Sequence, residues 1–319
     1  MNARLANATV AVLGYGHQGE AQALNLRDAG LRVVVGARPE GPSAARARAA
    51  GLEVRALAEA ARGAQAVALL LPDEALPALW PAIAPALAPE TALVFAHGFN
   101  LLYSNLHFDA RADVVLVSPT GPGRVLRALV QRGEHLPAYL AVHRDASGSA
   151  WALAEEFAAR VGCAPVLRTT VREETEVDLF GEQTVLCGGM NALVTAAFDT
   201  LVEGGAAPEL AFLECIHQLK YLADLLHERG VAGMREGISG TALYGDLTRG
   251  TRVVGAESRR AMREILAEIR SGAFAREWQA EVAAGRPRLR ELAERAAHHP
   301  LEEARRLALG QAPKGSRRP

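Results

Sequence analysis

The chain has 319 residues, of which 50% are hydrophobic, and a formal net charge of −1. This length and apolar content are sufficient for two domains with separate cores. Lys and Arg are spread along the chain apart from a short basic run at 314–318, so there is no electrostatic basis for binding nucleic acid or an acidic membrane surface. The three cysteines lack C-x-x-C spacing, which argues against a disulfide framework and is typical of a reducing compartment.

The sequence indicates no targeting or membrane segment. The N-terminus lacks a basic segment followed by an uninterrupted apolar stretch and a cleavage site. The apolar runs are strand-length and interrupted, so we expect none of them to span a bilayer. These features predict a soluble, cytoplasmic protein.

The first half of the chain alternates short apolar runs with helical patterns. Helices are predicted at 18–29 and from 44 to 50, and strands at 8–13, 31–35, 66–71, 92–95, 114–117 and 138–142. Continuous β-branched runs are typical of strands buried on both faces. Their spacing predicts a Rossmann-type domain, a doubly wound parallel sheet with right-handed crossovers, which we place at residues 1–165.

The second half is dominated by long helical patterns. They cover residues 180–200, 208–228 and 257–280, with glycine and proline between them. We therefore expect an all-helical domain at 166–310, followed by a disordered tail at 311–319. Its large apolar helices predict a homodimer or higher homo-oligomer, because such faces are commonly buried between subunits.

A glycine-rich turn joins the first predicted strand to the first helix. It reads Gly14-Tyr15-Gly16-His17-Gln18-Gly19, the G-x-G-x-x-G pattern. The first glycine allows the tight turn, the second lets the backbone approach a pyrophosphate, and the third packs the helix on the strand. The free N–H groups of the helix N-terminus favour the phosphates. Between a strand and a helix the motif indicates dinucleotide binding, although a glycine-rich turn without a ligand is the alternative.

The end of the second strand bears on the choice of cofactor. NAD sites usually carry an acidic residue there for the ribose hydroxyls, whereas this chain has Arg38, followed by Ser43. Arg38 can pair with a 2′-phosphate and Ser43 can donate a hydrogen bond to it, so NADP(H) is favoured. Glu40 leaves NAD(H) open, because it could take the acidic role from inside the loop. Arg38 could also be an ordinary solvated arginine.

An acidic stretch, EETEVDLFGEQ, begins at Glu173. Asp178 and Glu182 are four positions apart, so on a helix their carboxylates share one face. Like charges at this spacing are unfavourable unless a cation offsets them, and Mg²⁺ that keeps several waters would do so. The alternative is that these acids favourably load a helix N-terminus. Spacing alone leaves both interpretations open.

A second candidate acid lies on the next predicted long helix. Glu214 is surrounded by apolar residues, and Gln218 follows one turn later. A buried glutamate needs a partner, and a metal shared with Asp178 would supply one. A glutamate on the helix surface is the alternative.

Together these segments resemble the ketol-acid reductoisomerase family in its short bacterial form. The resemblance runs from residue 8 to about 278 and is carried by GYGHQG, LLPDE, AHGFN, GPG, ETEVDLFGEQ, LVEGG, PELAF, GISGTA and SGAFAREW. It implies NADPH (sometimes NADH) and Mg²⁺ as cofactors. It also implies two steps, the isomerisation of a 2-acetohydroxy acid by alkyl migration and the reduction of the resulting 2-keto-3-hydroxy acid. A knotted path through the helical domain is implied as well, against the usual base rate.

The resemblance assigns roles to individual residues. His97 matches the active-site histidine, which could orient substrate or relay a proton, although a structural loop histidine is also possible. Ser239 matches the serine that holds the substrate carboxylate. The metal ligands implied are Asp178, Glu182 and Glu214. The cofactor would be lined by Tyr15, Gly16, His17, Gln18, Arg38, Ser43, Asp73, Glu74, Ala75 and Leu76, with Gly123 near the nicotinamide.

The sequence departs from the family's pattern at three places. Thr120 replaces a lysine in the PTGPG loop, Gln218 replaces the second glutamate of the helix motif, and SGTAL from Ser239 replaces Ser-Asn-Thr-Ala-Glu. Gln218 can accept a hydrogen bond but cannot serve as a carboxylate base. Because the resemblance puts all three near the substrate, alkyl migration is the step most endangered. We predict an enzyme that reduces a 2-keto-3-hydroxy acid, with His97, Gln218 and Ser239 as its catalytic candidates.

Three other functions stay open at this point. One is a full ketol-acid reductoisomerase of branched-chain amino-acid biosynthesis. Another is a 6-phosphogluconate- or hydroxyacid-type dehydrogenase, which has a similar domain plan but leaves Asp178, Glu182 and Glu214 unexplained. The last is a non-catalytic nucleotide-binding module derived from the family.

Overall fold

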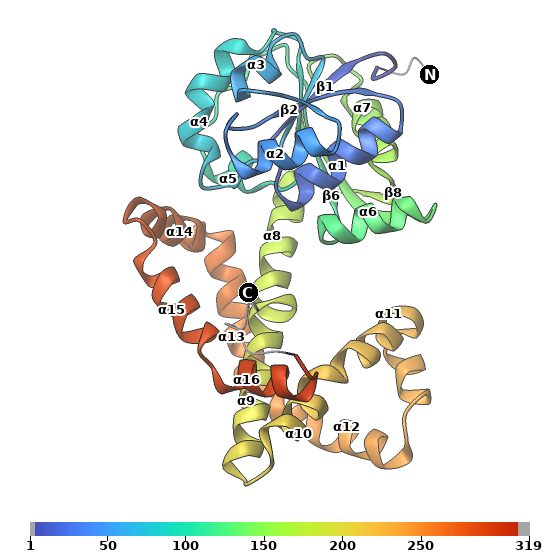
Figure 1. The fold of residues 1–319 in the computed structure, drawn as a ribbon, viewed down its shortest axis with the longest axis vertical. Coiled ribbons are helices and arrows are strands. Elements are labelled where there is room, and N and C mark those ends of the chain that lie inside the picture. The colour runs from blue at the N-terminus through green and yellow to red at the C-terminus, as the bar shows by residue number, and fades with distance from the viewer. Residues whose placement is uncertain (1–3, 312–319) are drawn as a thin grey trace, which may run out of the picture. The chain divides into compact units, whose positions relative to one another are not determined.

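The computed structural model describes residues 4–311 (Figure 1). It divides into two compact units, which we call the N-terminal and C-terminal units and which meet between Val177 and Asp178. The N-terminal unit is a sheet with helices and the C-terminal unit is helical, so the predicted fold class is confirmed. The predicted tail falls outside the described residues beyond Gln311, and the knotted path stays a prediction.

The N-terminal unit is built on one eight-stranded sheet of order β3-β2-β1-β4-β5-β6-β7-β8. The strands are β1 (Thr9–Leu13), β2 (Arg32–Gly36), β3 (Glu53–Arg55), β4 (Ala66–Leu69), β5 (Ala92–Phe95), β6 (Val114–Pro119), β7 (Leu136–Arg144) and β8 (Cys163–Arg168). Strand β1 pairs in parallel with β2 on one side and β4 on the other. The winding direction reverses there, and ligands bind at such switch points in open α/β sheets.

Helices cover both faces of this sheet (Figure 1). They are α1 (His17–Asp28), α2 (Pro42–Ala49), α3 (Leu57–Ala61), α4 (Leu76–Ile83), α5 (Phe99–Tyr103), α6 (Gly123–Gln131) and α7 (Ala150–Val161), with the 3₁₀ turn η1 (Ala84–Ala86). Val10 and Val12 of β1 pack in one buried cluster with Phe157 of α7, whereas Leu13 packs in a second cluster with Trp80 of α4. Alternate residues of one strand thus serve two cores, which explains its continuous apolar sequence.

The outer strands differ from the prediction. Strand β7 runs antiparallel to β6, and its partly exposed residues are typical of a strand away from the fully covered centre of a sheet. Strands β3 and β8 were not predicted. Three residues with exposed ends make up β3, and β8 is mostly exposed beyond Cys163. Neither strand carries the apolar run by which a buried strand is recognised.

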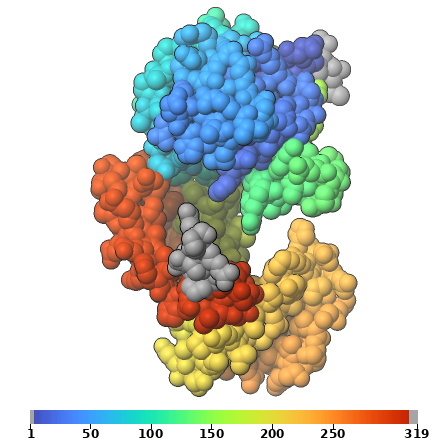
Figure 2. Space-filling model, viewed as in Figure 1, coloured from blue at the N-terminus to red at the C-terminus, as the bar shows by residue number. Residues whose placement is uncertain are grey.

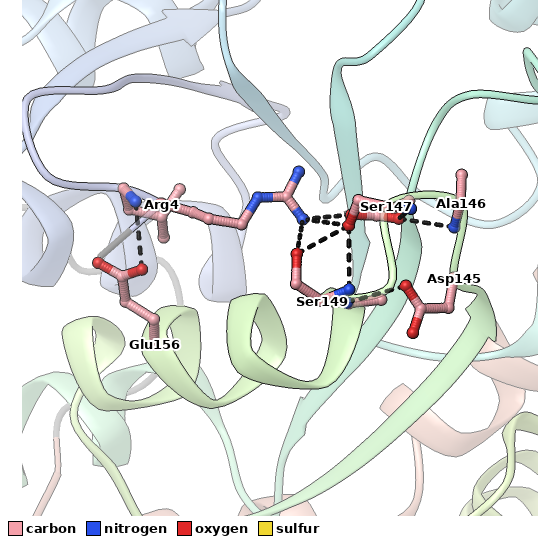
Figure 3. Close-up of polar contacts among 9 residues, drawn as sticks. Arg4, Asp145, Ala146, Ser147, Ser149 and Glu156 are labelled. Carbon is pink, nitrogen blue, oxygen red and sulfur yellow. Dashed lines mark hydrogen bonds and ion pairs between the residues drawn. The ribbon is translucent and has the colours of Figure 1, made fainter. Parts of the chain in front are cut away.

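A polar network fastens Arg4 and Leu5 to the loop before β6, the loop before α7 and α7 itself (Figure 3). Arg4 forms an ion pair with Asp113, which is 1% exposed, and its guanidinium lies 3.0 Å from Ser147 Oγ. The other Asp113 oxygen accepts from the backbone N–H groups of Ala146 and Ser147. Leu5 N donates to Glu156 of α7 at 3.1 Å. The buried carboxylate therefore has several donors, as a desolvated charge requires.

The C-terminal unit begins within a long helix. Its elements are the end of α8 (Val171–Gly181), the π turn η2 (Glu182–Leu186), α9 (Gly188–Glu203), α10 (Pro208–Phe212), the π turn η3 (Leu213–His217), α11 (Leu219–Glu236), α12 (Gly240–Val253), α13 (Ala256–Arg270), α14 (Ala273–Ala283), α15 (Pro287–Ala297) and α16 (Pro300–Ala308). The helix predicted at 257–280 is two helices. Gly272, in the left-handed region with φ 73°, breaks it before α14.

The core of the C-terminal unit is small. Phe198, Ala211, Phe212 and Ala304 form one buried cluster among its described residues. Many large apolar side chains are exposed instead, among them Val185, Leu186, Met190, Leu193, Leu219, Tyr221, Leu222, Leu226, Val231, Tyr244, Leu247, Val253 and Val254. Figure 2 shows that the surfaces of α11 and α12, in light orange, are accessible on the viewed face of this unit.

One helix is long and apolar enough to cross a membrane by length and composition alone. It is the helix Val171–Glu203, and only 6% of its most apolar window is buried. In the sequence, the acidic stretch from Glu173 to Glu182 interrupts the apolar pattern of this helix, so only shorter apolar runs were visible. Exposed apolar side chains on such a helix also suit burial against another protein chain.

Candidate functional site

The glycine-rich turn has the geometry that a dinucleotide requires. Gly14 has φ 98°, and a Cβ there would lie 2.4 Å from Leu70 O. A Cβ on Gly19 would lie 2.1 Å from Gly14 O, whereas nothing lies within 4 Å of the equivalent position on Gly16. The first and third glycines are thus required by packing, and the second leaves open space at the N-terminus of α1 for a phosphate.

The PTGPG loop lies directly against this turn. Gln18 Nε2 donates to Gly121 O at 2.9 Å, and a Cβ on Gly123 would lie 2.0 Å from His17 O. The N-termini of α1 and α6 therefore approach each other closely. Thr120, where the family has lysine, is exposed and donates through Oγ1 to Pro137 O at 2.9 Å. Its hydroxyl is thus bonded to the backbone at the start of β7, and the position supplies no positive charge.

The residues expected at the adenosine end lie on a turn and the following helix. Gly41 N donates to Arg38 O at 2.9 Å, which closes a turn containing Glu40. The side chains of Arg38 and Glu40 are both exposed. Ser43 is the second residue of α2 and is half-buried. An arginine beside a helix N-terminus is chemically suited to a 2′-phosphate.

Two arginines that sequence reasoning missed hold this region together. Arg46 Nη2 donates to Tyr15 O at 2.8 Å, and its guanidinium lies 5.9 Å from the Tyr15 ring centroid. Arg48 donates to Pro39 O at 2.8 Å. Arg46 follows Ser43 by three residues on α2, so helical spacing was the available signal.

The turn after β4 carries Asp73, Glu74, Ala75 and Leu76. Asn100 Nδ2 donates to Asp73 Oδ1 at 2.9 Å and also to its carbonyl oxygen. Burial raises the pKa of Asp73, while the nearby His97 and the Asn100 hydrogen bond act in the opposite direction. Ala75 caps α4, and Leu76 is the buried first residue of that helix. This turn is therefore fixed to the loop that follows β5.

His97, on the loop after β5, is held by a buried carboxylate. Glu174 of α8 has no exposed side-chain surface; its Oε1 lies 3.3 Å from His97 Nδ1 and its Oε2 accepts from Gly98 N at 3.0 Å. A Cβ on Gly98 would lie 2.1 Å from Thr175 Oγ1, so the loop is packed tightly on α8. Glu174 was not predicted as a site residue. Its only signal was its place in the acidic stretch.

The acids of the C-terminal unit lie on two separate helical segments. Half-buried Asp178 is in the last turn of α8 and exposed Glu182 begins η2, one turn later. Glu214 is exposed in η3 and accepts from Gln218 Nε2 at 2.6 Å. Within residues 4–311, no group of three or more His, Cys, Asp or Glu residues is close enough to hold a metal. Asp178 and Glu182 fit one hard cation that keeps several waters, and Glu214 is not brought to them within this chain.

Ser239, the remaining catalytic candidate, caps α12. Its exposed Oγ accepts a hydrogen bond from Ala242 N at 3.2 Å. A serine at the N-terminus of a 14-residue helix is a suitable place for an anionic group.

The sheet with its glycine-rich turn, followed by a helical unit with carboxylates, defines a dinucleotide-dependent oxidoreductase. Two family models narrow this class. Residues 4–166 match the NADPH-binding domain of acetohydroxy acid isomeroreductase, and residues 171–307 match the C-terminal domain of ketol-acid reductoisomerase. The chain belongs to the ketol-acid reductoisomerase family, as the motifs predicted, and the other dehydrogenase classes are set aside.

Solved structures agree with this family. An NADH-preferring ketol-acid reductoisomerase from an uncultured archean is 38% identical, covers 93% of this chain and 92% of its own, and has a TM-score of 0.91. A putative oxidoreductase from Jannaschia sp. (16% identity, 84% and 98% coverage, TM-score 0.59) shares the fold alone. The same is true of the Plasmodium falciparum pyrroline carboxylate reductase (13% identity, 83% and 98% coverage, TM-score 0.53).

Proposed function

We propose that the chain is an NADP(H)- and Mg²⁺-dependent reductase of a 2-keto-3-hydroxy acid in which the acetohydroxy-acid isomerisation step is impaired. One contact carries the proposal, the 2.6 Å hydrogen bond from Gln218 Nε2 to Glu214 Oε2. In the family pattern both positions are carboxylates. Here the amide of Gln218 occupies one position and donates a hydrogen bond to the Glu214 carboxylate at the other. The geometry of the glycine-rich turn is intact.

The two steps make different demands on the residues present. Alkyl migration needs a base for the substrate hydroxyl proton, and a neutral amide at position 218 cannot take that proton. The Thr120 hydroxyl bonded to Pro137 O offers no charge to replace the family's lysine. Reduction needs the cofactor's hydride and a polarised carbonyl, and a Mg²⁺ ion held by Asp178, Glu182 and Glu214 would supply that polarisation when bound. His97, oriented by Glu174, would hold the substrate or deliver a proton.

Support for NADP(H) comes from Arg38, in the turn before α2, and from Ser43, the second residue of α2. The archean relative is described as NADH-preferring, and Glu40 lies in the same turn as Arg38, so both cofactors should be measured. Arg38→Ala should lower kcat/KM for NADPH at least about tenfold and leave NADH within about twofold, since only NADPH has the 2′-phosphate. The matched control is Arg32→Ala, an exposed arginine at the start of β2. Equal losses for both cofactors would contradict the assignment of Arg38.

We propose that the working form is at least a homodimer. Apolar side chains of η2, α9, α11 and α12 are exposed in the single chain, which is typical of a surface that another chain covers. Glu214 does not reach Asp178 and Glu182 within residues 4–311. A second copy covering this face could supply its own Glu214 to the pair, so that oligomerisation would complete the metal site.

A full ketol-acid reductoisomerase of branched-chain amino-acid biosynthesis is the second candidate. Family membership and the 38% identity to the archean enzyme favour it. The non-catalytic nucleotide-binding module has less support, because the buried Glu174 that holds His97 serves no evident purpose in cofactor binding alone.

The test is NADPH oxidation with 3-hydroxy-3-methyl-2-ketobutyrate, the already isomerised substrate, with Mg²⁺ and with EDTA. We expect turnover only with Mg²⁺, and a loss of at least about 100-fold in Glu182→Gln. Glu173→Gln, at an exposed carboxylate that accepts from Thr169 Oγ1, is the matched control and should stay within about twofold. Absence of turnover while NADPH still binds would overturn the proposal in favour of the binding module.

A further inference from the structure

Two π-helical turns occur within residues 4–311, and each contains a candidate metal ligand. In η2, Cys187 N donates to Glu182 O at 3.0 Å, and in η3, Gln218 N donates to Leu213 O at 3.2 Å; both are bonds between residues five apart. Fewer than about 1% of residues in globular proteins adopt this geometry, and π turns are frequent at functional sites. Finding Glu182 in one and Glu214 in the other suggests that the turns serve the carboxylates.

Two consecutive glycines make η2 possible. A Cβ on Gly188 would lie 2.2 Å from Gln183 O, and a Cβ on Gly189 would lie 1.9 Å from Thr184 O. Both obstacles are backbone carbonyls inside the helix, so they cannot move aside while the π turn persists. Thr184 also favours the turn, because its Oγ1 donates to Phe180 O at 2.7 Å and draws that carbonyl away from regular helical bonding.

The π turn sets the direction of the preceding acids relative to α9. A π turn contains one residue more than an α turn, and one residue corresponds to about 100° of rotation and about 1.5 Å of rise. Helix α9 is anchored in the C-terminal unit by Phe198, which is 1% exposed in the cluster with Phe212. Closing η2 into a regular helix would therefore turn Asp178 and Glu182 about 100° away from their present direction.

We propose that Gly188 and Gly189 are positioning residues for the divalent-cation site, because they keep η2 open and so direct the carboxylates of Asp178 and Glu182. The inference rests on the proposed Mg²⁺ dependence. It assigns a role to residues that would not touch the cation.

The experiment is a Mn²⁺ titration of the full-length protein, in which the electron paramagnetic resonance signal of the free ion measures how much Mn²⁺ is unbound. Mn²⁺ is the probe because it accepts the same oxygen ligands as Mg²⁺. In Gly188→Ala and Gly189→Ala, studied below their unfolding temperatures, we expect Mn²⁺ affinity to fall at least about tenfold while NADPH affinity is unchanged. The matched control is Gly245→Ala in α12, where nothing lies within 4 Å of the added Cβ; it should bind Mn²⁺ as the unaltered protein does.

Folded Gly188→Ala and Gly189→Ala proteins with unaltered Mn²⁺ affinity would overturn the inference. If neither variant folds, Thr184→Val and Thr184→Ser decide. The valine should weaken Mn²⁺ binding at least about threefold and the serine, which keeps the hydroxyl, should restore it; equal affinities would overturn the inference.

An unaltered protein that binds no Mn²⁺ would overturn the proposed metal dependence and this inference together. Mn²⁺ binding that is lost in Glu182→Gln but kept in both glycine variants would overturn this inference alone.

Discussion

Both carboxylate oxygens of Glu174 are occupied, one by His97 Nδ1 and the other by Gly98 N. In Glu174→Gln an amide group must replace one of these acceptors and face a donor. Because hydrogen bonds to charged groups contribute about 1.5–3 kcal/mol, we expect a loss of stability of that order in urea unfolding. We also expect kcat to fall while the KM for NADPH stays unchanged, since His97 is no longer held in place by the carboxylate.

The control for this prediction is the neighbouring Glu173→Gln, whose carboxylate is exposed. Surface substitutions of this kind usually change stability by about 0.5 kcal/mol or less. A Glu174→Gln protein as stable as the control, with an unaltered kcat, would show that Glu174 does not hold His97.

Asp113 predicts a specific acid sensitivity. Burial acts to raise the pKa of Asp113, but hydrogen bonds from Arg4, Ser147 and Ala146 outweigh it and hold the pKa below the usual 3.8. A lowered folded-state pKa adds stability above the unfolded-state value, and this stability is lost as the pH falls through the folded-state value. Urea unfolding between pH 6 and pH 3 should therefore show a decline that is smaller in Asp113→Asn, a variant also less stable near pH 7. Parallel pH profiles for the two proteins would contradict this.

At the residue scale the sequence predicted what local geometry dictates. The roles of Gly14 and Gly19 follow from one turn between a strand and a helix, and the structure has the close backbone approaches that the motif requires. Arg46 and Glu174 escaped prediction because their partners Tyr15 and His97 lie 31 and 77 positions away along the chain. One sequence without a fold does not bring such positions together.

At the scale of elements, the contact between α1 and α6 can be tested at one glycine. A Cβ on Gly123 would lie 2.0 Å from His17 O, so Gly123→Ala should push the two helix N-termini apart. We expect NADPH affinity, measured by fluorescence titration, to fall at least about tenfold because the phosphate-binding turn is displaced. Gly121→Ala is the matched control, since its Cβ would only reach Leu136 side-chain atoms at 3.4 Å. Equal NADPH affinities for the two variants would contradict the expectation.

Periodicity predicted the central elements and missed the irregular ones. The parallel strands β1, β2, β4, β5 and β6 were visible because both of their faces are buried, which gives continuous apolar runs. The π turns were not visible, because one additional residue changes an apolar pattern no more than normal variation does. The only local indication of η2 was the glycine pair Gly188-Gly189, and such a pair equally well predicts the end of a helix.

At the scale of the whole molecule, the exposed apolar surface of the C-terminal unit predicts oligomerisation. Leu247 on α12 is 56% exposed, and Leu247→Glu would put a charge into any interface formed there. We expect light scattering after size exclusion to give at least a dimer for the unaltered protein and a smaller species for this variant. Leu167→Glu, at an equally exposed leucine (56%) on β8, is the control and should leave the assembly unchanged. A monomeric unaltered protein would contradict the prediction.

The assembly could be expected from the sequence only in outline. Apolar helices predicted that some face is covered by another subunit, but amphipathic patterns alone do not say which side chains a single chain leaves exposed. The placement of Glu214 apart from Asp178 and Glu182 within residues 4–311 also emerged only from the structure. From the sequence we had expected Asp178 and Glu214 of the same chain to share one metal.

The loss of isomerisation is tested most directly by the ratio of NADPH oxidation rates with 2-acetolactate and with 3-hydroxy-3-methyl-2-ketobutyrate. The unaltered protein should use the second substrate at least about 100-fold faster, and Thr120→Lys/Gln218→Glu should move the ratio towards equality by at least about tenfold. That double variant restores the positively charged lysine that Thr120 replaces and the carboxylate that Gln218 replaces. Equal rates for the two substrates in the unaltered protein would contradict the proposal and identify a complete reductoisomerase that tolerates both substitutions.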